Sequence, residues 1–344
     1  MNIPEKIYSG WQKGGHVQGI AIDKEKGHIY FSFTTRLVKT DFEGKVLGSV
    51  EKLAGHLGCI TFCPEDGNVY GSLEYKHDII GRGIVNNTGA KFSDEDAFYL
   101  VRFETAHITE ENMDAESSGV MKGIYLREVV EDYKAVDEAG GKEHRYGCSG
   151  IDGTAFGPVF GEDKDSPHKL MVSYGVYGDT EREDNDYQVI LQYDIRDFDL
   201  YAKSINQMEL HHSGPEKCEA IYFLFTGNTT YGIQNLEYDS FTGNYFAAVY
   251  VGTKPQFRNP PRFIIEVTKA PVLDELQGRK GEKGLTLSLA GESEFPYGQT
   301  GFAAMGDGTY HISLPESDND KKLFSSTVLK YRLSKDKEKL FETV

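Results

Sequence analysis

Only four cysteines, one tryptophan and 11 prolines occur in this 344-residue sequence. Cys59 and Cys63 lie four residues apart without a second close pair, which does not match the spacing of a structural zinc site. We expect the thiols to be reduced and partly buried. No apolar run is long enough to span a bilayer, and no signal-peptide-like segment follows the first residues. This start predicts a cytoplasmic protein, whereas a trimmed start would permit an extracellular one.

Basic residues are also scarce relative to acidic ones. Lys and Arg total 37 against 54 Asp and Glu, for a net charge of -17. Nucleic acids are held by clustered Lys and Arg, and anionic membrane surfaces attract the same residues. We therefore expect neither nucleic acid nor membrane as a partner.

Glycine and two aromatic residue types are plentiful. The sequence has 38 Gly, 21 Tyr and 20 Phe, and 39% of its residues are hydrophobic. Tyr and Phe favour strands, and Gly favours the tight turns between them. This composition predicts an all-β protein with a large core.

A strand, a turn rich in Asp and Gly, and a second strand recur five times along the chain. This is a hairpin pattern, and a third strand follows each hairpin. The hairpins lie at 16–33, 56–73, 150–174, 232–249 and 298–314, and the third strands at 37–40, 99–103, 189–193, 263–267 and 327–331. Fourth strands are visible at 45–50 and 285–289.

Repeated four-stranded antiparallel units are typical of a β-propeller. The sequence predicts one domain over 1–344 with five blades. A sixth blade would have to lie in 104–146 or 200–230, but 126–136 has helical apolar spacing. We therefore expect a short helical insertion near 120–140. The predicted blades cover 12–50, 51–145, 146–225, 226–292, and 293–344 together with 5–11.

The N-terminal segment predicts how the ring closes. Residues 6–16 resemble 45–56, which lead from an outer strand into an inner one, yet no blade precedes them. We expect residues 5–11 to be the outer strand of the last blade, paired with 327–333. The alternative is that 339–344 takes this place. Closure of either kind hides a sheet edge.

Long insertions lie on one predicted face of the propeller. The loops after the second strands are long, at roughly 74–97, 177–187, 252–262 and 315–325, whereas the first hairpin turns are short. Long ordered insertions are usually functional. This face, where the inner strands begin, is therefore the predicted working surface.

Polar residues converge at the start of the inner strands. Aligning the repeats places Gln18, Gly58, Asp152, Gln234 and Thr300 at equivalent positions, with His16 and His56 nearer the rim. The candidate catalytic residues are Asp152, His16, His56 and Glu74, and the candidate substrate-binding residues are Gln18, Lys76, His77, Gln234, Gln299, Tyr297 and Lys254.

Several chemistries fit these residues. His16, His56 and Asp152 are suitable ligands for one divalent metal ion at the axial mouth. Facing carboxylates such as Asp152 and Glu74 suit glycosidic hydrolysis. Lysines that neutralise an acidic sugar suit a lyase. The competing interpretation is that the polar groups line a water-filled channel.

The repeats resemble the five-bladed β-propeller superfamily, which includes glycoside hydrolases, nucleotidases and lectins. The resemblance covers nearly the whole chain and rests on blade architecture. Five-bladed glycosidases have a carboxylate where this sequence has His16 and Gln18, and the Ser-x-Asp-x-Gly-x-x-Trp box of sialidases is absent. The resemblance therefore transfers no catalytic residue.

Taken together, these features predict a carbohydrate-active propeller enzyme, a glycoside hydrolase or a lyase. Its expected ligand is a small molecule or oligosaccharide in a pocket at the axial mouth. The alternative is a non-catalytic ligand-binding or scaffold propeller. The polar positions differ from blade to blade, which favours one asymmetric site over five equal ones.

Overall fold

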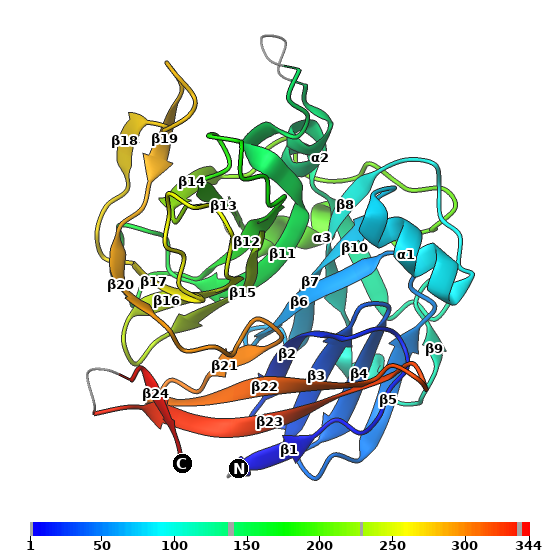
Figure 1. The fold of residues 1–344 in the computed structure, drawn as a ribbon. Helices are drawn as coiled ribbons and strands as arrows, with labels where there is room; N and C mark the ends of the chain where they lie inside the picture. Colours follow the sequence, from blue (N-terminus) through cyan, green and yellow to red (C-terminus); the bar gives the residue numbers. More distant parts are fainter. Residues whose placement is uncertain (1–2, 137–140, 228–229, 336–338) are drawn as a thin grey trace.

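The computed structural model describes residues 3–136, 141–227, 230–335 and 339–344. Five mainly antiparallel sheets surround a common axis and form a five-bladed β-propeller (Figure 1). The predicted fold class is confirmed. In the described part of the chain, no helix has the length and apolar character needed to cross a membrane.

The first two blades each contain four strands in sequence order from the axis outward. Blade 1 comprises β2 (Val17–Asp23), β3 (His28–Phe33), β4 (Arg36–Asp41) and β5 (Val46–Glu51), with β9 (Met113–Asp114) parallel to β5. Blade 2 comprises β6 (His56–Cys63), β7 (Asn68–Tyr75), β8 (Ala97–Phe103) and β10 (Met121–Tyr125).

The third and fourth blades follow the same order. Blade 3 comprises β11 (Cys148–Gly157), β12 (Lys169–Val176), β13 (Tyr187–Tyr193) and β14 (Ala220–Phe225), extended outward by β19 (Lys283–Thr286) and β18 (Val272–Glu275). Blade 4 comprises β15 (Thr230–Asp239), β16 (Asn244–Tyr250), β17 (Arg262–Glu266) and β20 (Leu289–Ser293).

Blade 5 closes the ring with both ends of the chain. Its inner strands are β21 (Phe302–Ala304), β22 (Thr309–Asp318) and β23 (Leu323–Leu333). On the outer edge of β23, β1 (Lys6–Tyr8) pairs with residues 327–329 and β24 (Phe341–Thr343) with residues 331–333. Closure by the N-terminal strand is confirmed. The predicted alternative is also present, because β23 is long enough to carry both partners (Figure 1).

The fourth strand expected at 285–289 was assigned to the wrong blade. Residues up to Thr286 belong to β19, which pairs in parallel with β14 of blade 3, and β20 supplies the fourth strand of blade 4. Gly284 lies against the ring of Phe223, where any Cβ would overlap it. Local alternation predicts a strand but not the sheet edge it joins.

Helical segments are short. The predicted insertion is present as α2 (Arg127–Lys134), whose Val129, Val130 and Tyr133 are buried. The segment after β7 contains α1 (Ile79–Thr88), and α3 (Phe198–Tyr201) follows β13. Single 3₁₀ turns occupy Thr105–His107, Arg145–Gly147 and Ile195–Asp197.

The Asp/Gly turns of the repeat have a common structure. In the first hairpin, the Asp23 carboxylate accepts hydrogen bonds from the backbone N–H groups of residues 25 and 26, and Gly27 has φ +70°. Asp239 and Gly243 repeat this arrangement in blade 4. Glycine is favoured at the left-handed position because it has no Cβ. Local residues therefore determine these turns.

Hydrophobic cores lie between neighbouring sheets and are rich in tyrosine. Tyr30, Tyr70, Tyr99 and Tyr174 are fully buried in the largest cluster, which joins blades 1 to 3. The four cysteines are all buried free thiols. The packed cores hold the inner strands in fixed positions about the axis.

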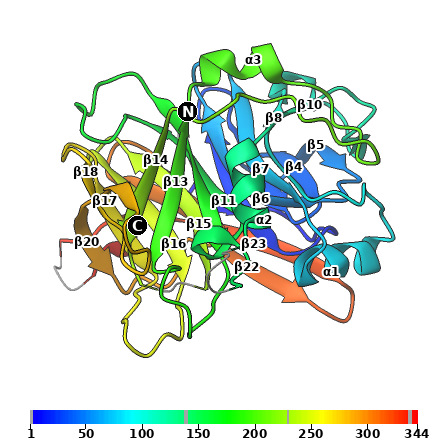
Figure 2. The same ribbon diagram turned by 90° about the horizontal axis from the view of Figure 1, so that it is seen from above.

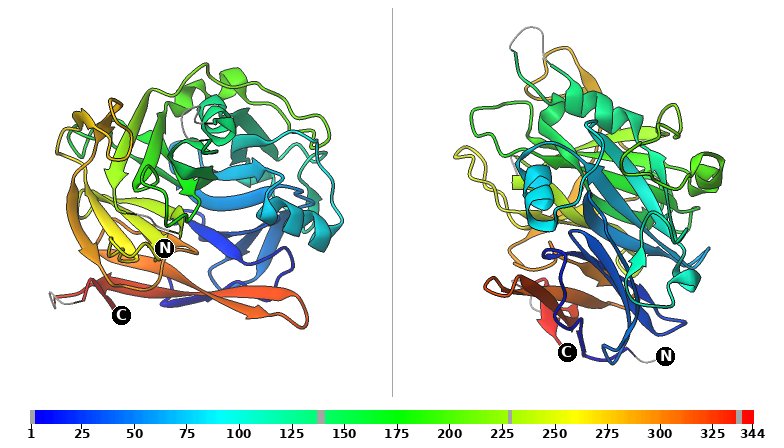
Figure 3. Two further views of the ribbon diagram at one scale, coloured as in Figure 1. Left: turned by 45° about the horizontal axis from the view of Figure 1, so that its top comes forward. Right: turned by 90° about the vertical axis from the view of Figure 1, so that its right-hand side faces the viewer.

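Two inserted elements stand over the same end of the axis. The segment expected as a loop at 315–325 is the end of the β22–β23 hairpin, in which strand pairing continues to Asp318 and Leu323. Figures 2 and 3 show α1 and this hairpin on the same side of the molecule. Together they flank a cavity at this end of the axis.

Candidate functional site

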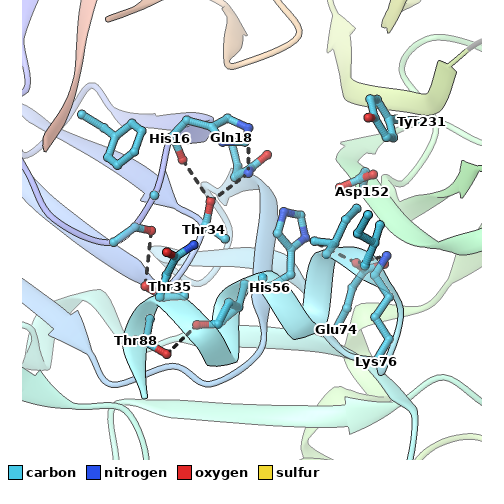
Figure 4. A pocket seen from close by; sticks show the side chains of 18 of the residues that line it. His16, Gln18, Thr34, Thr35, His56, Glu74, Lys76, Thr88, Asp152 and Tyr231 are labelled. Atoms are coloured by element: carbon cyan, nitrogen blue, oxygen red, sulfur yellow. Dashed lines mark hydrogen bonds and ion pairs between the residues drawn. The ribbon is translucent and has the colours of Figure 1, made fainter. Parts of the chain in front are cut away.

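A cavity of about 600 Å³ lies at this end of the axis (Figure 4). Its volume is within the range of small-molecule sites, which is roughly 300–1,000 Å³. The strands β2, β6, β7, β11 and β15 contribute polar side chains, and α1 and the β22–β23 hairpin contribute walls. The predicted residues that line the cavity are His16, Gln18, His56, Glu74, Lys76, Asp152 and Gln234.

The inner strands are bulged where they face the cavity. The strand register shifts between Val17 and Gly19 in β2, and corresponding shifts occur around Gly58, Asp152 and Gln234. These are the positions that the repeat alignment makes equivalent. A β-bulge turns a side chain away from the regular alternation of a strand, and bulges are common beside active sites.

Four predicted residues lie outside the cavity lining. His77 is exposed and contacts Asp96, and Tyr297 is 42% exposed. Gln299 donates from its amide to the Val249 carbonyl oxygen. Lys254 is buried in an ion pair of 2.6 Å with Asp186. Each of these residues lies in a loop, and tertiary packing determines the path of the loop. The position of the residue in the repeat therefore did not predict whether its side chain reaches the cavity.

Glu74 is the centre of a buried charged group in the cavity floor. Its Oε2 lies 2.9 Å from Lys76 Nζ and 3.3 Å from His56 Nδ1, and its Oε1 accepts a hydrogen bond of 2.5 Å from the Ile151 N–H. Burial acts to raise the pKa of Glu74, but Lys76 and His56 outweigh it and the pKa is lowered. The carboxylate is therefore ionised, and the same pairing raises the pKa of Lys76 against the effect of burial.

Gly150 makes room for this carboxylate. A Cβ at Gly150 would overlap Glu74 Oε1, and its φ of +123° is strained for any other residue. The same glycine brings the next residue's N–H to the carboxylate. Its backbone conformation is thus part of the Glu74 site.

Asp152 is only partly buried and faces the cavity. Its Oδ2 accepts a hydrogen bond of 3.0 Å from the Gln234 amide. Burial, followed by the negative charge of Glu74, raises the pKa of Asp152 to about 7. Two nearby carboxyl groups thus differ in protonation at neutral pH, which is the arrangement found in acid–base sites.

His16 and Gln18 form the side of the cavity next to blade 1. The Gln18 amide lies 3.1 Å from His16 Nε2 and donates to Thr34 Oγ1 at 3.2 Å. Burial, together with His56, lowers the pKa of His16 to about 4. His16 is therefore neutral at physiological pH, and this side of the cavity offers uncharged hydrogen-bonding groups.

Asn235 seals the axis below the cavity. Its amide donates to the carbonyl oxygens of Gln18, Gln234 and Gln299, and its oxygen lies 3.2 Å from Cys59 Sγ. This side chain of blade 4 is 2% exposed and contacts residues of blades 1, 2 and 5. The polar residues therefore line a closed floor at this point rather than an open channel. The repeat alignment did not single out Asn235, because its role depends on neighbouring blades.

The predicted metal ligands do not form a metal-binding cluster. Among the described residues, no three His, Cys, Asp or Glu side chains gather in a metal-ligating arrangement. His56 faces Glu74, Asp152 accepts from Gln234, and the Lys76 ammonium already neutralises Glu74. A bound cation would compete with this ammonium group, so the residues present do not fit a divalent ion.

Sequence reasoning missed the upper walls of the cavity. Ile80 and Ile84 of α1, Phe324 of β23, and Tyr231 and Tyr250 of blade 4 line it. The apolar spacing of Ile80 and Ile84 is a sequence signal for this helix. No sequence signal indicates that this helix lies over the axis, because its position depends on the blade that carries it.

No family model and no curated protein matches the chain. Solved structures that are similar include a functionally unknown protein from Desulfotomaculum acetoxidans (10% identity, TM-score 0.36, covering 96% of this chain and 69% of that one). A gluconolactonase from Xanthomonas campestris has 9% identity and a TM-score of 0.36, with coverage of 93% and 88%. A β-propeller domain from Myceliophteria thermophila has 11% identity and a TM-score of 0.32, with coverage of 90% and 82%.

Proposed function

We propose that the protein is a hydrolase of a small, neutral, polyhydroxylated substrate of the sugar type, bound in the axial cavity. The observation that carries the proposal is the pairing of Asp152, whose pKa is about 7, with a buried Glu74–His56 pair in one cavity floor. Hydrolysis of a C–O bond needs one group to protonate the leaving oxygen and another to take a proton from water.

Asp152 is the proposed general acid. Its protonated carboxyl donates to the leaving oxygen as the C–O bond breaks, and the Gln234 amide fixes its orientation. Because the pKa is about 7, the acid is still largely protonated below neutral pH. A pKa near the working pH is the most effective for proton transfer.

His56 is the proposed general base. Its Nδ1 faces the ionised Glu74 at 3.3 Å, an arrangement that favours a proton on Nδ1 and leaves Nε2 to accept one from water. The resulting hydroxide forms the new C–O bond. Both oxygens of Glu74 are occupied by Lys76, His56 and the Ile151 N–H, so Glu74 acts through His56 rather than as a nucleophile.

The charges of the cavity favour a neutral substrate. Of the cavity-lining cations, Lys76 is occupied by Glu74 and the Ser149 carbonyl oxygen, and Lys322 lies at the tip of the hairpin. Elimination from an acidic sugar requires a free cation against the substrate carboxylate. Gln18, Gln234 and neutral His16 instead suit hydroxyl groups. The charges of the cavity therefore favour hydrolysis of a neutral substrate over elimination from an acidic sugar.

The test is turnover of a panel of neutral glycosides, with and without a chelator. We expect Asp152→Asn and His56→Gln each to lower kcat by about 100-fold or more, which is the typical contribution of a general acid or base. The chelator should have no effect. Tyr297→Phe, outside the cavity, is the matched control and should keep wild-type kcat.

Two outcomes would contradict the proposal. One is wild-type turnover by Asp152→Asn. The other is calorimetric binding of glycosides without product, which would identify the protein as a non-catalytic ligand-binding propeller.

A further inference from the structure

The cavity has two chemically different halves. Its floor carries the polar groups of β2, β6, β7, β11 and β15, whereas its walls toward solvent carry Ile79, Ile80 and Ile84 from α1 and Phe324 from β23. Figure 4 shows the labelled polar side chains of the floor together with the helix beside them. A ligand that fills both halves must be polar at one end and apolar at the other.

The helical wall is fixed in place. Asp78 caps α1 by accepting from the N–H groups of Ile80 and Gly81, and its second oxygen accepts from the Tyr177 hydroxyl at 2.9 Å. Gly81 packs so closely on the Lys76 carbonyl oxygen that a Cβ would overlap it. The helix is therefore held against Lys76, which also lines the cavity, and its apolar side is preorganised for binding.

Ile84 shows that this side of α1 serves the cavity. It is 6% exposed, yet among the described residues it does not belong to the hydrophobic clusters of the blades. Val85, the next residue, packs against the core of blades 1 to 3 instead. Thus the partly buried Val85 of α1 packs against the core, whereas Ile80 and Ile84 line the cavity.

The opposite wall is also anchored. The Phe324 backbone exchanges two hydrogen bonds with Gln12, of 2.7 and 2.8 Å, which tie the hairpin to the N-terminal segment. On a third side, Tyr231 packs edge-on against Tyr250 at a ring distance of 5.9 Å. Aromatic and aliphatic side chains that converge on a polar floor are typical of sites for amphipathic small molecules.

We propose that the substrate is an amphipathic glycoside: a sugar head at the polar floor and an apolar aglycone between α1 and the β22–β23 hairpin. This inference rests on the proposed function. It adds Ile84 and Phe324 as residues that determine specificity for the aglycone. They contact the leaving group without taking part in proton transfer.

The experiment measures the binding of methyl, butyl and hexyl glucosides, galactosides and mannosides by calorimetry, below their micelle concentrations. Burial of methylene groups raises affinity by up to about fourfold each. We expect affinity to rise with chain length in the wild type. In Ile84→Ser and in Phe324→Ser the rise in affinity with chain length should flatten. Leu200→Ser, an exposed site on α3 that is 74% accessible, is the control.

The outcomes separate this inference from the proposed function. Turnover of methyl glycosides with no dependence on chain length would overturn the apolar subsite and leave the hydrolase intact. A chain-length dependence without turnover would support the subsite and overturn the hydrolase. Absence of binding by every glycoside would overturn both. Because the two variants lie on opposite walls, the test can still be read if one of them fails to fold.

Discussion

Replacing Lys76 with methionine removes the cation from the buried pair in the cavity floor. The Glu74 and Lys76 side chains are only 2% and 4% exposed, and their charged atoms lie 2.9 Å apart. Methionine fills a similar volume but leaves the Glu74 carboxylate without its ammonium partner. Breaking a buried pair on one side costs about 3–5 kcal/mol of unfolding free energy. We expect a loss of this size.

The matched variants separate charge from packing. The double variant Glu74→Gln with Lys76→Met leaves no buried charge, so it should recover most of the loss. Lys45→Met changes an exposed lysine and should alter stability by less than about 0.5 kcal/mol. Urea unfolding followed by circular dichroism measures all three. A loss below about 1 kcal/mol in Lys76→Met would refute the reasoning, because it would mean that water reaches the carboxylate.

The pH dependence of stability is a second test of the Lys76→Met variant. In the wild type the folded-state pKa of Glu74 is below its ordinary value, so its contribution to stability is present above that value and is lost as the pH falls. In Lys76→Met, burial acts without the cation, so the folded-state pKa should rise above the unfolded one. Its stability then decreases as pH rises. The difference between wild type and variant should therefore grow from about pH 4 to pH 8.

Further changes test the surrounding groups. Because the pKa of Asp152 is raised to about 7, wild-type stability relative to Asp152→Asn should fall as the pH rises from about 4 to 7, as measured by thermal unfolding, and a flat difference would contradict this pKa. Gly150→Ala should cost more than about 2 kcal/mol, since its Cβ would overlap Glu74. Gly83→Ala in α1, where a Cβ meets nothing within 4 Å, should instead stabilise by about 0.5–1 kcal/mol. Asn235→Ala should cost about 2–3 kcal/mol in urea unfolding, because three blades lose hydrogen bonds. Equal effects of both glycine variants, or a neutral Asn235→Ala, would contradict the packing described.

The repeat in the sequence determined the propeller and its five blades. Each hairpin is specified locally, by strand alternation and by turns such as Asp23 to Gly27, so its pattern survives in the sequence. The similarity of residues 6–16 to 45–56 also located the closing strand. The repeat register brought Gln18, Asp152 and Gln234 to one end of the axis, because equivalent positions in a ring face the same centre.

Tertiary structure alone decided the ionisation and burial of those residues. The ionisation of Glu74 and the raised pKa of Asp152 depend on burial and on distances between blades, which no local pattern records. The same holds for Lys254, whose partner Asp186 is distant in sequence, and for the placement of β19 in blade 3. Local patterns specify strands and turns, whereas charge, burial and the apolar walls arise only when separate blades meet.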